Sequence, residues 1–145
     1  MVIFSKGRRT LTIASIATLV VAAINTVGIF IPPPANDEAL LALIKAARDY
    51  RLDLGLGMSP SIWDVQQALA VTTSLLLIAI AVFGLSFAGD RDAAPRTMSR
   101  IAVIATGTMA ALTVAYAVFQ IAPPLVSMAV LAILYLVASL RTLRA

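Results

Sequence analysis

The 145-residue sequence contains no cysteine and no histidine. Disulfide bonds, thiol chemistry, and metal or haem sites that depend on thiolate or imidazole ligands are therefore excluded. The acidic residues match no calcium-binding loop, so we expect no metal site and no cofactor. An enzyme would have to work with carboxylates in the 37–64 region and with Tyr50, and we do not expect this protein to be an enzyme.

Charge is also scarce. Charged residues make up 12% of the chain and hydrophobic residues 61%, against about 25% and about 45–50% in soluble domains. A soluble domain of this length could not bury so much apolar surface, because small domains keep much of their surface in water. The composition therefore predicts an integral membrane protein.

Four long stretches carry no charge at all. Prolines 32–34 end the first, and Pro123 and Pro124 divide the charge-free run between Arg100 and Arg141 into two. Each stretch is long enough to cross a hydrocarbon core of about 30 Å as a helix. We predict an all-α fold, a membrane four-helix bundle forming one domain over 1–145. The predicted spans are about 11–31, 64–88, 101–122 and 124–140.

A cleaved signal peptide is the competing interpretation of the first span. Lys6, Arg8 and Arg9 give the segment the basic start that signal peptides have. Its apolar run of about 21 residues is longer than the usual stretch of about 7–15 residues, and no small-x-small cleavage site precedes the prolines. We therefore expect the segment to remain as a span.

The basic residues are distributed unequally between the two sides of the predicted spans. Three of the 11 lie in the long segment after span 1, and the other eight lie at the termini and in the 89–100 loop. Basic residues stay on the cytoplasmic side, so we expect both termini in the cytoplasm of a bacterial inner membrane. These positions also explain the pI of about 10.1, and no nucleic-acid partner is expected.

The long outer segment between spans 1 and 2 predicts one further helix. Asn36 is a candidate N-cap, and an amphipathic helix over about 36–51 is expected to end at Gly55 and Gly57. Its apolar face has helical spacing. The residues of this face are Leu40, Leu43, Ile44 and Ala47. Ser59 or Ser61 would cap the second span, and Trp63 would anchor it at headgroup depth.

The polar residues inside the spans are neutral, and two interpretations of them are open. They can join helices by hydrogen bonds, as polar groups in membrane bundles do. Alternatively, those near the outer ends can orient a ligand in a mainly apolar pocket beneath the outer helix, which would act as a lid. The ligand-binding candidates are Asn25, Gln66, Gln67 and Gln120.

Small residues recur every four positions in two spans. The rows are Ala14, Thr18, Ala22 and Thr26 in the first span, and Gly107, Ala111 and Ala115 in the third. Such rows allow helices to approach closely in lipid, where the hydrophobic effect does not drive helices together. We expect both rows to pack inside the bundle.

The outer segment resembles a known family. The sequence at 34–38, 49–54 and 61–64, leading into a span with serine and threonine, is similar to a family of small bacterial four-span membrane proteins of unknown function, first labelled from a Leptospira genome. The resemblance implies the four-span topology and no activity. Members often carry histidines near the end of the first span, where this chain has Ile24-Asn25-Thr26-Val27-Gly28. A site that depended on those histidines would be missing here.

The leading functional hypothesis is a non-enzymatic inner-membrane protein. It would act through partner proteins or by binding membrane lipid or an apolar ligand. The alternative is a small transporter or channel subunit. Apart from Asp64 at the very start of the second, no charged residue falls inside the predicted spans. This argues against proton-coupled transport, because proton relays need ionisable groups within the membrane.

Overall fold

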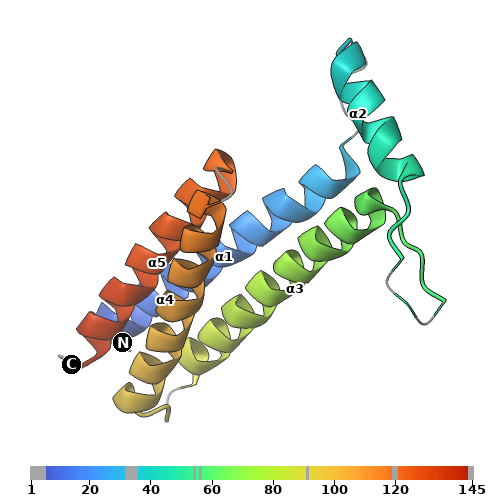
Figure 1. The fold of residues 1–145 in the computed structure, drawn as a ribbon. Helices are drawn as coiled ribbons and strands as arrows, with labels where there is room; N and C mark the ends of the chain where they lie inside the picture. Colours follow the sequence, from blue (N-terminus) through green and yellow to red (C-terminus); the bar gives the residue numbers. More distant parts are fainter. Residues whose placement is uncertain are drawn as a thin grey trace. The chain divides into compact units, whose positions relative to one another are not determined.

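The computed structural model describes residues 6–31, 36–53, 55, 57–90, 92–118 and 121–143. They form five α-helices (Figure 1): α1 (Lys6–Phe30), α2 (Glu38–Asp49), α3 (Ile62–Gly89), α4 (Pro95–Val118) and α5 (Ala122–Leu143). Extended pairing within these residues is limited to one isolated antiparallel bridge between Arg51 and Ser61. The predicted all-α four-helix bundle is confirmed.

Helices α1, α3, α4 and α5 are long and apolar enough to cross a membrane, as a multi-pass membrane protein requires. The ends of α1, α4 and α5 differ from the predicted spans. Helix α1 begins at Lys6, five residues before the predicted start at 11. Helix α4 begins at Pro95, six residues before the predicted start at 101, and α5 continues to Leu143, beyond the predicted end at 140. A charge-free run marks only the part of a helix that needs lipid, whereas arginine can occupy a helix end and keep its charge at the interface.

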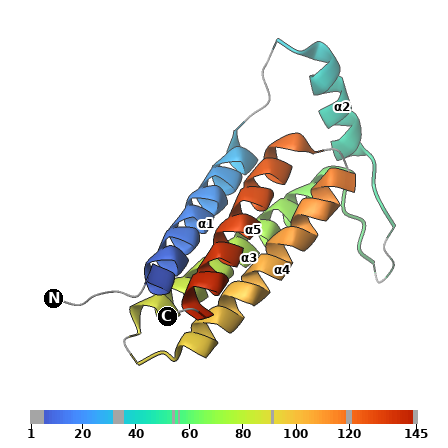
Figure 2. The ribbon, with the colours of Figure 1, turned by 90° about the vertical axis from the view of Figure 1, so that its left-hand side faces the viewer.

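The chain forms two compact units. The first combines Met1–Val21 with Leu77–Ala145, and the second is Ala22–Leu76. In the described part of the first unit, the first half of α1, the second half of α3, and all of α4 and α5 lie side by side (Figures 1 and 2). The second unit contains the remaining halves of α1 and α3 together with α2. A single domain over the whole chain stays a prediction.

The core of the first unit combines apolar side chains with several hydroxyl groups. Helices α4 and α5 form an antiparallel pair, in which the buried hydroxyls of Ser99 and Ser139 lie 3.0 Å apart. The largest fully buried side chains are Tyr135, Leu11, Leu77, Met109, Leu131, Thr18, Thr142 and Ser15. The row Ala14, Thr18 and Ala22 of α1 is fully buried, so the predicted packing of these three residues is confirmed.

The predicted packing of the small row in α4 is wrong. Gly107, Ala111 and Ala115 are exposed, and a Cβ added at Gly107 would meet no atom within 4 Å. The buried residues of α4 are instead Met98, Ser99, Ala102, Ala105 and Met109. In a membrane protein both lipid and neighbouring helices are apolar, so the spacing of small residues does not by itself say which face meets protein.

Helix α2 is shorter at both ends than the predicted 36–51. Asp37, not Asn36, is the N-cap, because its carboxylate accepts a hydrogen bond of 2.9 Å from the Leu40 N–H. The helix ends at Asp49, where Tyr50 turns into extended backbone. Gly55 and Gly57 do not end it. Both have positive φ, 74° and 76°, and they lie further along in the loop, where glycine adopts this backbone without strain.

Candidate functional site

The predicted ligand residue Asn25 joins two helices in the second unit. Its side-chain amide donates to the backbone carbonyl of Ala70 (3.2 Å) and to the Ser74 hydroxyl (2.7 Å). Ser74 in turn donates to the Ala70 carbonyl of its own helix. Both amide hydrogens are thereby used between α1 and α3. This arrangement matches the helix-joining interpretation, and it leaves the Asn25 carbonyl oxygen as the group that could meet a ligand.

The structure does not bring the other candidates to Asn25. Gln66 is exposed and Gln67 is half-buried, both about one turn before Ala70 on α3. Within the described residues, no hydrogen bond joins either glutamine to Asn25. Gln120 lies outside the described residues. A ligand site formed by these four residues therefore stays a prediction.

The apolar face of α2 is not buried by protein. None of the residues of α2 is buried, and Leu43 is 66% exposed. Leu40, Ile44 and Ala47, the other members of the face, are half-buried. A lid closed over a pocket would bury this face. Burying a leucine side chain stabilises by about 1.5–3 kcal/mol, and Leu43 does not gain this stabilisation from the described part of the chain.

The C-terminal end of α2 is tied to the start of α3 by a cluster that we call the outer staple, formed by Arg48, Arg51, Ser61, Trp63 and Asp64. The Arg48 guanidinium lies 4.9 Å from the centre of the Trp63 ring, a cation–π distance. Arg51 lies 3.5 Å from the Asp64 carboxylate, with both side chains largely exposed. An exposed ion pair contributes little stability by itself.

Backbone pairing makes the outer staple more rigid than its exposed ion pair would. Leu52 N–H donates to the Pro60 carbonyl (2.9 Å), and Ile62 N–H donates to the Tyr50 carbonyl (3.2 Å). The loop therefore returns on itself and brings the end of α2 to the beginning of α3. Because Trp63 lies in the first turn of α3, the staple holds the last turn of α2 beside the start of a candidate membrane span.

A capping box starts α3. The Ser61 hydroxyl accepts from the Asp64 N–H (3.0 Å), and the Asp64 carboxylate accepts from the Ser61 N–H (2.9 Å). Of the two predicted caps, Ser61 is therefore the one used. The Ser61-x-x-Asp64 spacing is a variant of the capping box, with aspartate in place of the usual glutamate or glutamine, and it could have been recognised in the sequence. Arg48 and Trp63 are fifteen positions apart, and no spacing rule predicts their contact.

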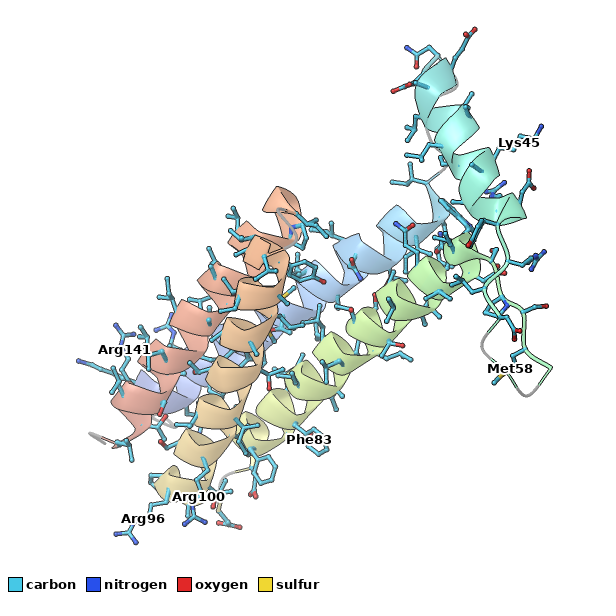
Figure 3. All side chains as sticks on the ribbon, viewed as in Figure 1. Lys45, Met58, Phe83, Arg96, Arg100 and Arg141 are labelled. Carbon is cyan, nitrogen blue, oxygen red and sulfur yellow. The ribbon has the colours of Figure 1, made fainter. Side chains whose placement is uncertain are left out.

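The outer staple and α2 together present both apolar and cationic groups. Among the described residues, no group of three or more His, Cys, Asp or Glu side chains is placed to hold a metal ion. The site offers a partly exposed apolar face on α2, an indole ring, and the cations Lys45, Arg48 and Arg51. Lys45 points away from α2 (Figure 3). Such a surface fits an interface that is apolar on one side and charged on the other.

Comparisons with known proteins identify no relative. No family model matches the chain, and neither a curated protein nor a solved structure matches it. The resemblance to the four-span family of unknown function therefore stays a prediction from the sequence.

Proposed function

We propose that this chain is a non-enzymatic protein of a bacterial inner membrane, with both termini in the cytoplasm. In this proposal the amphipathic helix α2 lies at the interface of the inner membrane that faces away from the cytoplasm. There it binds lipid, or an apolar ligand that partitions into the interface. Partner proteins would reach the chain at the same outer surface. The observation that carries the proposal is the apolar face of α2, where Leu43 is exposed and no residue is buried. The outer staple holds this helix beside the first turn of α3.

Single-cysteine labelling tests the position of α2, because the chain contains no cysteine that would have to be removed. Cysteine replaces Leu43 on the apolar face in one variant and Lys45 on the charged face in the other. With α2 in the interface, a membrane-impermeant maleimide should label position 43 roughly tenfold or more slowly than position 45. This factor follows from about 1.5–3 kcal/mol for burying a leucine side chain.

When the chain is denatured, the two cysteines should react with the maleimide equally fast. This control measures their intrinsic reactivity. Equal labelling rates in native membranes would mean that α2 lies in water, and the lipid-binding proposal would then be wrong. Trp63 is the only tryptophan, so its fluorescence reports the staple directly. Arg48→Ala should shift the Trp63 emission and raise the labelling rate at position 43, whereas Lys45→Ala should change neither.

The orientation is tested by reporter fusions. A reporter active only in the cytoplasm should work after Arg144 and within 90–96, and it should fail at 53–57. The reason is the distribution of basic residues, eight on the terminal side against three in the outer segment. Reporter activity at 53–57 would mean that the predicted orientation is wrong.

A small transporter or channel subunit is the second candidate. It is favoured by the buried hydroxyl groups of the first unit, which come from α1, α4 and α5: Thr10, Ser15, Thr18, Ser99, Ser139 and Thr142. Sequence reasoning did not find this group, because it looked for polar residues near the outer ends. Proteoliposomes containing the pure protein should then show an ion or solute flux that Thr18→Val and Ser139→Ala reduce. If the flux through the proteoliposomes is no larger than through protein-free liposomes, this candidate is eliminated.

A further inference from the structure

The inner ends of α1 and α5 are in backbone contact. A Cβ added at Gly7 would lie 2.6 Å from Thr142 Cα and 2.7 Å from Thr142 N. Only glycine permits this approach, because any side chain would overlap backbone atoms of α5. The contact brings the basic first turn of α1 and the last turn of α5 to one place.

Arg141 is fixed at this junction by Thr10. The Thr10 hydroxyl donates its single proton to the Lys6 carbonyl (2.8 Å), so it meets the Arg141 guanidinium as an acceptor, at 3.2 Å. Thr10 itself is only 6% exposed, whereas Arg141 is exposed. One N–H of the guanidinium is therefore held, and its other donors remain available to a ligand.

The described residues at this junction carry positive charge. Lys6 and Arg9 lie in α1 and Arg141 in α5, and neither helix contains an acidic residue. No described carboxylate forms an ion pair with Lys6 or Arg141. Holding like charges together costs free energy that an anion would remove. A phosphate group suits a guanidinium especially well, because two parallel N–H groups can contact two of its oxygens.

An apolar side chain near these cations indicates where the phosphate comes from. Lys6 and Ile13 lie about one turn on either side of Thr10, on the same side of α1. Ile13 is 51% exposed. A free phosphate would not contact this side chain, whereas a phospholipid would place its acyl chains against it.

We propose that Arg141, Lys6 and Thr10 form a binding site for the headgroup phosphate of an acidic phospholipid, with Ile13 contacting its acyl chains. Thr10 is a positioning residue, which acts by orienting the guanidinium. The site goes beyond the proposed function, because it is formed by α1 and α5 within the first unit and does not depend on what α2 binds. It would anchor α1 to α5 through a shared lipid.

The test measures thermal unfolding of the purified full-length chain in a neutral detergent. Phosphatidylglycerol, phosphatidylcholine and inorganic phosphate are titrated separately, and the shift of each midpoint gives an apparent affinity. Phosphatidylglycerol should stabilise the parent chain most. Arg141→Gln should weaken its affinity roughly tenfold or more, since a hydrogen bond to a charged group contributes about 1.5–3 kcal/mol. Lys6→Gln should weaken it less.

Two variants separate a built site from general charge attraction. Arg96→Gln removes one positive charge at the same end of the first unit (Figure 3) and should leave the affinity nearly unchanged. Thr10→Val removes no charge, yet it should weaken phosphatidylglycerol binding because Arg141 loses its fixed orientation. Each variant is compared with its own lipid-free midpoint, so a change in basal stability does not enter the result.

Three outcomes would overturn the site. Equal losses for Arg96→Gln and Arg141→Gln would show diffuse attraction. Stabilisation by phosphatidylcholine or inorganic phosphate as large as that by phosphatidylglycerol would show that the acidic lipid is not the ligand. Full affinity in Thr10→Val would remove the positioning role. Arg141→Lys should recover part of the affinity, since it restores the charge without the paired donors.

Discussion

Replacing Gly84 with leucine is expected to lower the free energy of unfolding by at least about 1–3 kcal/mol, the usual cost of overpacking. In the first unit α3 meets α1 at this glycine. An added Cβ would overlap Ser15 Oγ and would lie 3.3 Å from Ser15 Cβ. Ser15 is fully buried, so a leucine side chain finds no free space on this side of α3. The two helices would have to separate.

The matched control is Gly107→Leu, the same substitution in another span. Gly107 has no atom within 4 Å of an added Cβ, so this variant should unfold at nearly the parent midpoint. Unfolding is measured by circular dichroism in micelles during heating or titration with a denaturing detergent. If Gly107→Leu destabilises as much as Gly84→Leu, the packing faces of α3 and α4 are assigned incorrectly.

Substituting Ser15 tests whether its side chain causes the destabilisation expected at Gly84. The Ser15 hydroxyl is buried and has no hydrogen-bond partner among the described residues. Ser15→Ala should therefore be neutral or slightly stabilising, because it removes an unpaired polar group. Gly84→Ala should cost less in the Ser15→Ala background than in the parent, since the overlapping oxygen is then absent. Equal costs in both backgrounds would place the strain elsewhere.

The contrast between Gly84 and Gly107 also shows what the sequence could and could not predict. The four spans follow from charge-free runs, and the first small row, including Ala14 and Thr18, packs as predicted. The row at Gly107 follows the same spacing and is exposed. In water an apolar stripe must face the core, but lipid accepts such a stripe equally well. Periodicity therefore finds membrane helices more reliably than it finds their faces.

The candidate site was predicted less well for a related reason. Asn25 was among the polar residues that could join helices by hydrogen bonds, and it does join two. One of its partners, Ser74, is 49 positions away in sequence, and its identity depends on the register between α1 and α3. Several hydroxyl residues of α3 were equally eligible, including Thr72 and Thr73. Local signals such as the Ser61–Asp64 capping box can be recognised in a sequence, whereas contacts between spans require the packed structure.

Truncating Tyr135 to alanine is expected to have the largest effect of any single substitution, about 3–5 kcal/mol, as for other buried aromatic residues. Tyr135 is the largest fully buried side chain of the described residues. Its loss would leave a cavity between α1 and α5, where dispersion contacts and not the hydrophobic effect hold the helices together. Leu136→Ala, at the neighbouring 47% exposed position, should change the midpoint little.

The hydrogen bond of Tyr135 has a direction that substitutions can determine. Thr18 Oγ1 donates to the Ala14 carbonyl at 2.9 Å and lies 3.1 Å from the Tyr135 hydroxyl. A threonine hydroxyl carries one proton, so Tyr135 must be the donor in the second bond. Tyr135→Phe leaves Thr18 still bonded to its own helix and should cost about 0.5–1.5 kcal/mol. Thr18→Val leaves the phenol buried without an acceptor and should cost more, about 1–3 kcal/mol.

The double variant completes this test. Thr18→Val combined with Tyr135→Phe removes both polar groups, so it should be more stable than Thr18→Val alone. The measurement is the denaturing-detergent midpoint of the four chains, with retained helical circular dichroism as the control for folding. If Tyr135→Phe costs more than Thr18→Val, then Thr18 donates its hydrogen bond to the Tyr135 hydroxyl and not to the Ala14 carbonyl. If the double variant is the least stable of the four, the two hydroxyls stabilise the α1–α5 pair independently of each other.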